Sequence, residues 1–369
     1  MKSESKNSIL IIGGGLIGLS IAYEFARNKF KVEVLSKNRS ESAGFVAAGM
    51  LATHAEGLED ELLIFGQQSQ NLIPEWIKNI EKDSGIDCGL KKCGIVVPFK
   101  NIQELKKFPT YKYGKYLNNK NLRREISGIN STWEHGLLFE QDGQIDNRRR
   151  LMRALERACS LHGVKFQEGS DVKELILEKN TILGAKVLNA TGETKNIFCK
   201  KVILCCGAWS KKVLSNLPIF PVKGQMLSIQ GPENSIKRVL FGPTTYLVPR
   251  DDGLIVVGAT VENKAEFNQG NTPKGINQLQ AGIKSLLPEA LNWPQMEHWW
   301  GFRPCTPDLK PIIGKSNINN LYLATGHYRN GVLFSAITSD IIFKLIQQKT
   351  LNNKETNFLE KFSFNRFLI

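Results

Sequence analysis

The fold of this chain is decided by the stretch Ile9-Leu10-Ile11-Ile12-Gly13-Gly14-Gly15-Leu16-Ile17-Gly18. Its four apolar residues run into a cluster of glycines, which is typical of a buried strand that ends in a tight turn. Apolar residues then recur at helical spacing as far as Ala26, and a second apolar run at 31–35 predicts another strand. The stretch is therefore expected to open a βαβ unit.

The glycines fit the pattern Gly-x-Gly-x-x-Gly between a predicted strand and a predicted helix, the context in which this pattern is informative. Gly13 would form the tight turn, Gly15 would let the backbone approach a pyrophosphate, and Gly18 would let the helix pack closely on the strand. The helix N-terminus adds amide donors and partial positive charge for the phosphates. The pattern predicts a dinucleotide-binding domain.

The residue after the second strand departs from the usual dinucleotide pattern. An acidic residue is expected there to bind the ribose hydroxyls, but the chain has Ser36, followed by Lys37 and Arg39. A Ser with two nearby cations suits the 2′-phosphate of NADP. The alternative is FAD, with the Ser36 hydroxyl or a backbone group in place of the carboxylate. The residues alone leave both cofactors open.

Composition places the chain among globular proteins of about two domains. Its 369 residues are 41% hydrophobic and 23% charged, which excludes the disordered and collagen-like classes. The formal net charge of +14 is compatible with nucleic acid or anionic membranes, and equally with an enzyme of anionic cofactors and acids. Basic residues are scattered apart from 148–150, and no aromatic stripe accompanies that run, so we expect no nucleic-acid surface.

The cysteines and the N-terminus indicate a reducing compartment. Seven cysteines, an odd number with no Cys-x-x-Cys pair, predict neither a disulfide framework nor a metal site, so the cytoplasm is the expected location. Lys2 and Lys6 before an apolar run imitate a signal peptide, but the glycines that follow would break that run as a helix. We expect no targeting segment and no membrane span.

The rest of the chain interleaves nucleotide-domain pieces with β-rich insertions. Asp146 is expected to cap a helix that runs to His162, and the Lys- and Asn-rich stretch 100–131 is expected to be exposed loop. Other expected elements are helices at 56–85, 274–287 and 331–347, strands at 94–98, 202–206 and 321–324, a β-rich stretch at 164–205 and an antiparallel hairpin region at 219–261.

We therefore predict an α/β fold with two interleaved parts. A Rossmann-like nucleotide-binding domain would be assembled from three segments, 1–55, 145–215 and 300–369. Between them, 56–144 and 216–299 would form an α+β substrate domain built on an antiparallel sheet.

Several motifs together resemble the D-amino-acid oxidase family of FAD enzymes, in the right order over essentially the whole chain. Within that family the chain is most similar to the oxidases of glycine that serve thiamine biosynthesis. The motifs are the opening glycines, Phe45-Val46-Ala47-Ala48-Gly49-Met50-Leu51, Cys206-Gly207-Ala208-Trp209-Ser210, Tyr246-Leu247-Val248-Pro249-Arg250, Gly301-Phe302-Arg303-Pro304, Thr306-Pro307-Asp308 with Pro311-Ile312-Ile313-Gly314, and Gly326-His327-Tyr328-Arg329-Asn330-Gly331.

The resemblance implies FAD as the cofactor and makes the nucleotide-binding domain an FAD-binding domain. The related sarcosine oxidases hold their flavin covalently, but alignment on Thr306-Pro307-Asp308 places their attachment position near Gly301 and not at Cys305, so FAD is expected to be non-covalent. The resemblance assigns cofactor contacts to Gly13, Gly15, Ile17, Gly18, Ser36, Ala47, Ala48, Gly49, Met50, Val172, Gly207, Trp209, His327, Arg329, Asn330, Gly331, Val332 and Leu333.

For the substrate, the resemblance implies a carboxylate site. Arg303 would bind the carboxylate with its planar two-pronged guanidinium, which Lys cannot reproduce. Tyr246 would donate its hydroxyl to the same group and Arg329 would lie nearby, while Met50 and Val261 would form pocket walls. No residue is expected to act as a catalytic acid or base, and His327 is expected to have a turn or flavin-packing role.

The implied reaction is oxidation of glycine by O2 to the imino acid, which hydrolyses to glyoxylate and ammonia, with formation of H2O2. A hand-off to a thiazole synthase is expected, as are a small amino acid and O2 as partners and a homo-oligomeric state. Two alternatives stay open: an oxidase or dehydrogenase of larger D-amino acids or N-methyl amino acids, and a flavoprotein module of tRNA modification.

Overall fold

A computed structural model describes residues 8–368. Lys2 and Lys6, on which the likeness to a signal peptide depends, lie outside the described residues. Within residues 8–368, no helix combines the length and the apolar character that crossing a membrane requires.

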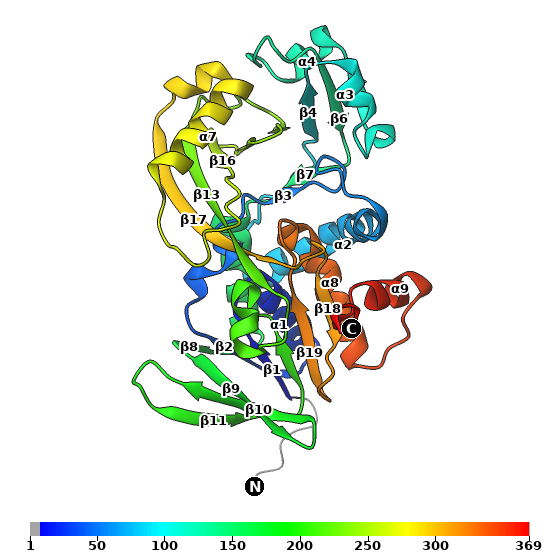
Figure 1. The fold of residues 1–369 in the computed structure, drawn as a ribbon, viewed down its shortest axis with the longest axis vertical. Coiled ribbons are helices and arrows are strands. Elements are labelled where there is room, and N and C mark those ends of the chain that lie inside the picture. The colour runs from blue at the N-terminus through cyan, green and yellow to red at the C-terminus, as the bar shows by residue number, and fades with distance from the viewer. Residues whose placement is uncertain (1–7, 369) are drawn as a thin grey trace.

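A six-stranded sheet forms the lower half of the molecule in Figure 1. All neighbouring strands are parallel except one outer pair, which is antiparallel. The sheet draws on three separated parts of the chain, which confirms the predicted three-segment assembly. In spatial order its strands are β18 (Ile312–Lys315), β19 (Leu321–Thr325), β12 (Val202–Leu204), β1 (Ser8–Ile12), β2 (Lys31–Ser36) and β8 (Lys165–Glu168).

One large apolar core joins this sheet to its helices. The helices are α1 (Leu16–Arg27), α2 (Asp60–Ser84), α5 (Met152–Leu161), α8 (Gly331–Ile346) and the C-terminal α9 (Asn353–Lys361).

The long α2 belongs to this core, although its residues were assigned by sequence to the substrate domain. Phe65 of α2 is fully buried, and its ring centroid lies 5.0 Å from that of Phe334 in α8 and 4.9 Å from that of Phe358 in α9. Because such contacts contribute burial and favourable ring geometry, α2 is held by the FAD-binding side. We propose a domain division that keeps the predicted segments but moves α2 to that side.

An eight-stranded, largely antiparallel sheet forms the upper half of the molecule (Figure 1). The long α7 (Pro273–Leu286) packs on it, and the hairpin predicted around Asp252-Gly253 is present. In spatial order the strands are β17 (Gln295–Cys305), β13 (Phe220–Gln230), β16 (Leu254–Gly258), β15 (Tyr246–Pro249), β14 (Val239–Phe241), β4 (Ile95–Phe99), β6 (His135–Phe139) and β5 (Lys115–Leu117).

The expectation that 100–131 is exposed is confirmed for most of its residues, but the expectation that it is loop is wrong. This stretch forms α3 (Ile102–Lys106), β5 and α4 (Asn119–Glu125) at the edge of the eight-stranded sheet. Its few apolar side chains, such as Leu117 and Leu122, are buried in the core of that sheet. A high density of Lys and Asn hid these single buried positions, since each element here is too short to show a clear period.

The remaining strands form two small sheets, and the remaining α-helix is short. A three-stranded antiparallel sheet of β9 (Asp171–Glu178), β10 (Thr181–Leu188) and β11 (Thr194–Phe198) lies at the bottom of Figure 1. The pair β3 (Met50–Leu51) and β7 (Gly143–Gln144) lies between the two large sheets, and α6 (Ser210–Val213) follows the turn after β12.

Candidate functional site

A cavity of about 890 Å³ is lined by residues from both large sheets. Residues that follow the carboxyl ends of β1, β2, β12 and β19 line it, which is where open α/β sheets bind their ligands. Its volume lies in the range of cofactor and ligand sites. The cavity is therefore the candidate site for both the dinucleotide and the substrate.

The glycine turn has the geometry that a pyrophosphate requires. Gly13 has φ +111°, and a Cβ there would collide with the Cys205 carbonyl. A Cβ on Gly18 would overlap the Gly13 carbonyl, so a side chain at either position would push the turn out of place. The N-cap of α1, Gly15, makes no side-chain capping bond, which leaves first-turn amides free for phosphate oxygens.

The cations beside Ser36 are already paired with carboxylates. Lys37 Nζ lies 2.9 Å from Asp171 Oδ2, while Arg39 Nε donates to Glu168 at 2.8 Å and its Nη1 lies 3.2 Å from Glu156. A 2′-phosphate would have to displace these partners. The structure therefore disfavours the NADP interpretation, and Ser36 itself, only 8% exposed, lines the cavity.

The start of α8 also faces the cavity. Its N-cap, Asn330, makes no side-chain capping bond, and Gly331 and Val332 line the wall. Free amides at a helix start stabilise negative charge, which suits the pyrimidine side of a reduced flavin. The buried His327 shares a 3.0 Å hydrogen bond with Thr338 of α8, and burial lowers its pKa to about 3, so the imidazole is neutral at physiological pH.

Most residues assigned by resemblance meet at the cavity. Three do not line it: Gly18 lies beneath the turn, Asn330 caps α8, and Leu333 is buried in the core. Those that line it are Gly13, Gly15, Ile17, Ser36, Ala47, Ala48, Gly49, Met50, Val172, Gly207, Trp209, Tyr246, Val261, Arg303, His327, Arg329, Gly331 and Val332.

Arg303 on β17 makes no ion pair with any of the described residues. Its Nη1 donates to the backbone carbonyls of Thr260 at 3.1 Å and Lys223 at 3.4 Å, which are neutral acceptors. Burial lowers its pKa, although an arginine stays charged at neutral pH. The guanidinium lies over Gly224 of β13, where a Cβ would come 2.5 Å from Nη1. Gly224 therefore makes the room that this side chain occupies.

Tyr246 at the start of β15 is packed in the same way. It pairs with Gly258 of β16, and a Cβ at that position would collide with its hydroxyl. Burial raises the pKa of Tyr246 above its ordinary value, against the opposing effect of Arg303. The hydroxyl is therefore a protonated donor that faces the cavity, 3.6 Å from the sulfur of Met226.

Arg329 differs from Arg303 because its charge is balanced. Its Nε lies 3.4 Å from Glu56 Oε2, and this carboxylate raises its pKa. Its guanidinium also lies 5.9 Å from the ring centroid of Phe241, which stacks on Tyr246. Glu56 and Phe241 line the cavity too, and no motif in the sequence marked them.

The remaining candidates are Cys305, which lies outside the cavity, and Val261, which lines it. Cys305 is buried, does not line the cavity and donates its thiol to the Thr306 carbonyl, and burial raises its pKa to about 11. Such a thiol is protonated and unreactive at neutral pH. Val261 is 47% exposed at the cavity wall. The residues thus fit a bound dinucleotide next to Arg303, an arginine that has no ion pair among the described residues.

Comparison with known proteins identifies the family of this chain. A family model described as FAD dependent oxidoreductase, DAO, matches residues 8–345. The bifunctional protein ThiO/ThiG of Synechocystis sp. is 37% identical over 373 residues, which cover 99% of this chain and 55% of that protein. The chain therefore spans about half the length of such relatives.

Two similarities extend over full lengths. The glycine oxidase of Bacillus subtilis is 28% identical over 97% of this chain and 96% of its own sequence. The crystal structure of glycine oxidase from Bacillus cereus has a TM-score of 0.86 with this chain at 25% identity, and the match covers 96% of this chain and 98% of that chain.

Proposed function

The chain belongs to the DAO family of FAD-dependent oxidoreductases, and on that premise we propose that it oxidises the amine of a small α-amino acid, with glycine as substrate. The observation that carries this proposal is Arg303, a cation with no carboxylate partner among the described residues. Its position beside the Tyr246 hydroxyl on a cavity wall suits one bound carboxylate.

The chain's own residues would position the substrate. The guanidinium of Arg303 can donate two N–H hydrogen bonds to a carboxylate in its plane. The Tyr246 hydroxyl, on the same sheet, can donate a third. Fixing one end of a small molecule in this way aligns its Cα and amine, which is the main contribution that positioning makes to rate. Bound FAD would supply the redox chemistry by accepting two electrons and passing them to O2.

No residue is needed to remove a proton from Cα. His327, the one histidine at the cavity wall among the described residues, has a pKa near 3 and bonds to Thr338, so it is a poor base. The chain would hold FAD through the glycine turn and the start of α8. The pairing of Arg329 with Glu56 leaves Arg303 as the one arginine at the cavity wall without an ion pair among the described residues, which favours a monocarboxylate over a diacid.

The relatives support glycine as the substrate. Proteins named glycine oxidase match nearly the full chain, and the relatives at 37% identity carry ThiO fused to ThiG. We propose that the imino product passes to a thiazole synthase. The cytoplasm is the proposed location, since all seven cysteines are free, and a homo-oligomer stays a prediction. Larger D-amino acids and N-methyl amino acids are the alternative substrates.

Anaerobic mixing tests this proposal without a coupled assay. Glycine should abolish the visible absorption of the bound flavin, and readmission of O2 should restore it with release of H2O2. Reduction by D-phenylalanine but not by glycine would replace the proposal with the D-amino-acid alternative. A flavin that none of the amino acids reduces would refute the proposed activity.

A further inference from the structure

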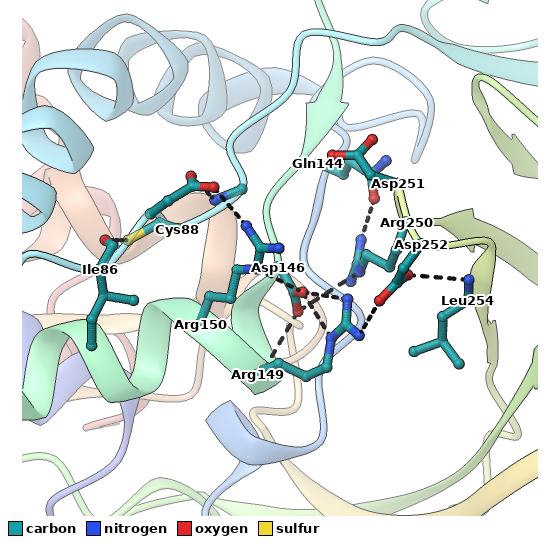
Figure 2. A network of polar contacts seen from close by, with 12 residues as sticks. Ile86, Cys88, Gln144, Asp146, Arg149, Arg150, Arg250, Asp251, Asp252 and Leu254 are labelled. Atoms are coloured by element: carbon teal, nitrogen blue, oxygen red, sulfur yellow. Dashed lines mark hydrogen bonds and ion pairs between the residues drawn. The ribbon is translucent and has the colours of Figure 1, made fainter. Parts of the chain in front are cut away.

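A buried arginine joins the eight-stranded sheet to the segment 47–50. Arg250 directly follows β15, and Figure 2 shows its side chain directed toward Gln144 and Asp146. Its Nη1 donates to Gln144 Oε1, and its Nη2 donates to the backbone carbonyl of Ala48. The side chain is only 6% exposed. Arg250 ends the motif Tyr246-Leu247-Val248-Pro249-Arg250, but nothing above gives its side chain a role.

Arg250 has fewer carboxylate partners than the two arginines beside it, so its hydrogen bonds to Gln144 and Ala48 matter more. Three arginines share Asp146, but Arg149 also pairs with Asp252 and Arg150 also pairs with Asp87. Arg250 Nε lies 3.7 Å from Asp146 Oδ1, and it has no second carboxylate in the described part of the chain.

Burial lowers the pKa of Arg250 to about 10, so the group stays charged at neutral pH. A buried charge is tolerated only when donors find acceptors. The Gln144 amide oxygen and the Ala48 carbonyl are the acceptors for its two terminal nitrogens, whereas the buried Nε makes no hydrogen bond and has only the Asp146 carboxylate nearby.

Because Arg250 follows β15, its hydrogen bond to Ala48 connects that strand, which carries Tyr246, to the segment 47–50. β15 begins at Tyr246, whose hydroxyl faces the cavity, and Arg250 follows its last residue. Ala48 lies in the cavity-lining segment 47–50, which is also docked through the 2.8 Å bond from Ile145 N to Gly49 O. One short strand thus carries Tyr246, which lines the cavity, at its start, and it is followed directly by the arginine that binds the cavity-lining segment 47–50.

We propose that Arg250 is a positioning residue that sets the separation between the segment 47–50 and Tyr246. The proposal rests on the proposed function in one respect, the placement of segment 47–50 against the flavin. A lysine would keep the charge but could not reach Gln144 and Ala48 together, because one ammonium replaces the two separated nitrogens of the fork.

Substitution of Arg250 with a matched control tests the role. Arg250→Met removes the charge and both donors, and Arg149→Met removes a neighbouring arginine that also binds Asp146 but does not contact Ala48. The readouts are the dissociation constant of FAD from the apoprotein, the visible circular dichroism of bound FAD, and titration with acetate, followed by the flavin absorption.

In Arg250→Met, the flavin dichroism should change. Acetate should bind about fivefold more weakly or worse, because a displaced Tyr246 would lose its hydrogen bond to the carboxylate, and losing one bond to a charged group has effects of this order. Arg149→Met should stay within about twofold of the parent in all three readouts, although its melting temperature also falls. A purely structural role would lower the melting temperature of both variants and leave the flavin readouts unchanged.

Arg250→Lys serves if Arg250→Met does not fold, and it should show the same changes. Parent-like dichroism and parent-like acetate binding in Arg250→Lys would overturn the proposal, as would equal changes in Arg149→Met. These readouts need no turnover of glycine. A parent protein that binds acetate but does not oxidise glycine would refute the proposed function and leave the role of Arg250 standing.

Discussion

At the scale of single residues, two glycines leave the space that the side chains of Arg303 and Tyr246 occupy. The Arg303 guanidinium occupies space above Gly224, and the Tyr246 hydroxyl occupies space above Gly258. The motifs around Tyr246 and Arg303 made their place at the cavity predictable, and their contact with a substrate stays a prediction. Gly224 and Glu56 were not predictable, because their roles depend on neighbours that only the folded sheet brings close.

Replacing Arg303 with Lys should separate substrate binding from cofactor binding. Arg303→Lys keeps a positive charge but loses the fork, so kcat/KM should fall about tenfold or more if about 1 to 3 kcal/mol of charge-assisted bonding is lost. FAD content should stay at the level of the parent. Steady-state H2O2 release measures the first quantity and the flavin absorption measures the second. A variant as efficient as the parent would remove Arg303 from the substrate site.

The buried His327 should make the protein less stable in acid. Its pKa is about 3 when folded and its ordinary value is 6.5, so the unfolded chain binds a proton in this window that the folded chain does not. Stability should therefore be fully present above pH 6.5 and fall as the pH drops toward 3, by up to about 1.4 kcal/mol per pH unit from this group.

His327→Gln offers the Thr338 hydroxyl an uncharged partner, so its stability should fall less steeply with acid. Urea unfolding at several pH values below 6.5 measures the difference in slope. Equal slopes for parent and variant would show that His327 is protonated in the folded protein.

At the scale of elements, regular patterns made the large pieces predictable. The strand, glycine turn and helix at 9–26 and the cap at Asp146 lie where the sequence placed them. The failure at 100–131 has a physical cause. The helices α3 and α4 are short, and single residues such as Leu122 are buried between Lys and Asn side chains, so the chain shows no amphipathic period there.

A core substitution in α4 checks that this segment is folded. Leu122 is fully buried, and its Cδ1 lies close to Gly136 of β6. Leu122→Ala should lower the free energy of unfolding by about 2 to 5 kcal/mol through lost burial and the cavity it leaves. Lys120→Ala, at an exposed position of the same helix, should change it by less than about 0.5 kcal/mol. Similar small effects for both variants would indicate an unfolded edge.

At the scale of the whole molecule, the site exists only because two sheets meet. The parallel sheet supplies the glycine turn and the start of α8, and the antiparallel sheet supplies Tyr246 and Arg303. The three-segment assembly could be predicted from interleaved motifs. The position of α2 could not, because its apolar face suits either part and only packing against α8 and α9 decides between them.

The most direct test of the account is a comparison of substrates that differ in one group. Steady-state H2O2 release should give a higher kcat/KM for glycine than for glycinamide, which has no carboxylate for Arg303 and Tyr246, and a higher value than for D-phenylalanine, whose side chain must find space in the pocket. If glycinamide is oxidised as efficiently as glycine, or D-phenylalanine far more efficiently, the carboxylate site for a small amino acid is contradicted.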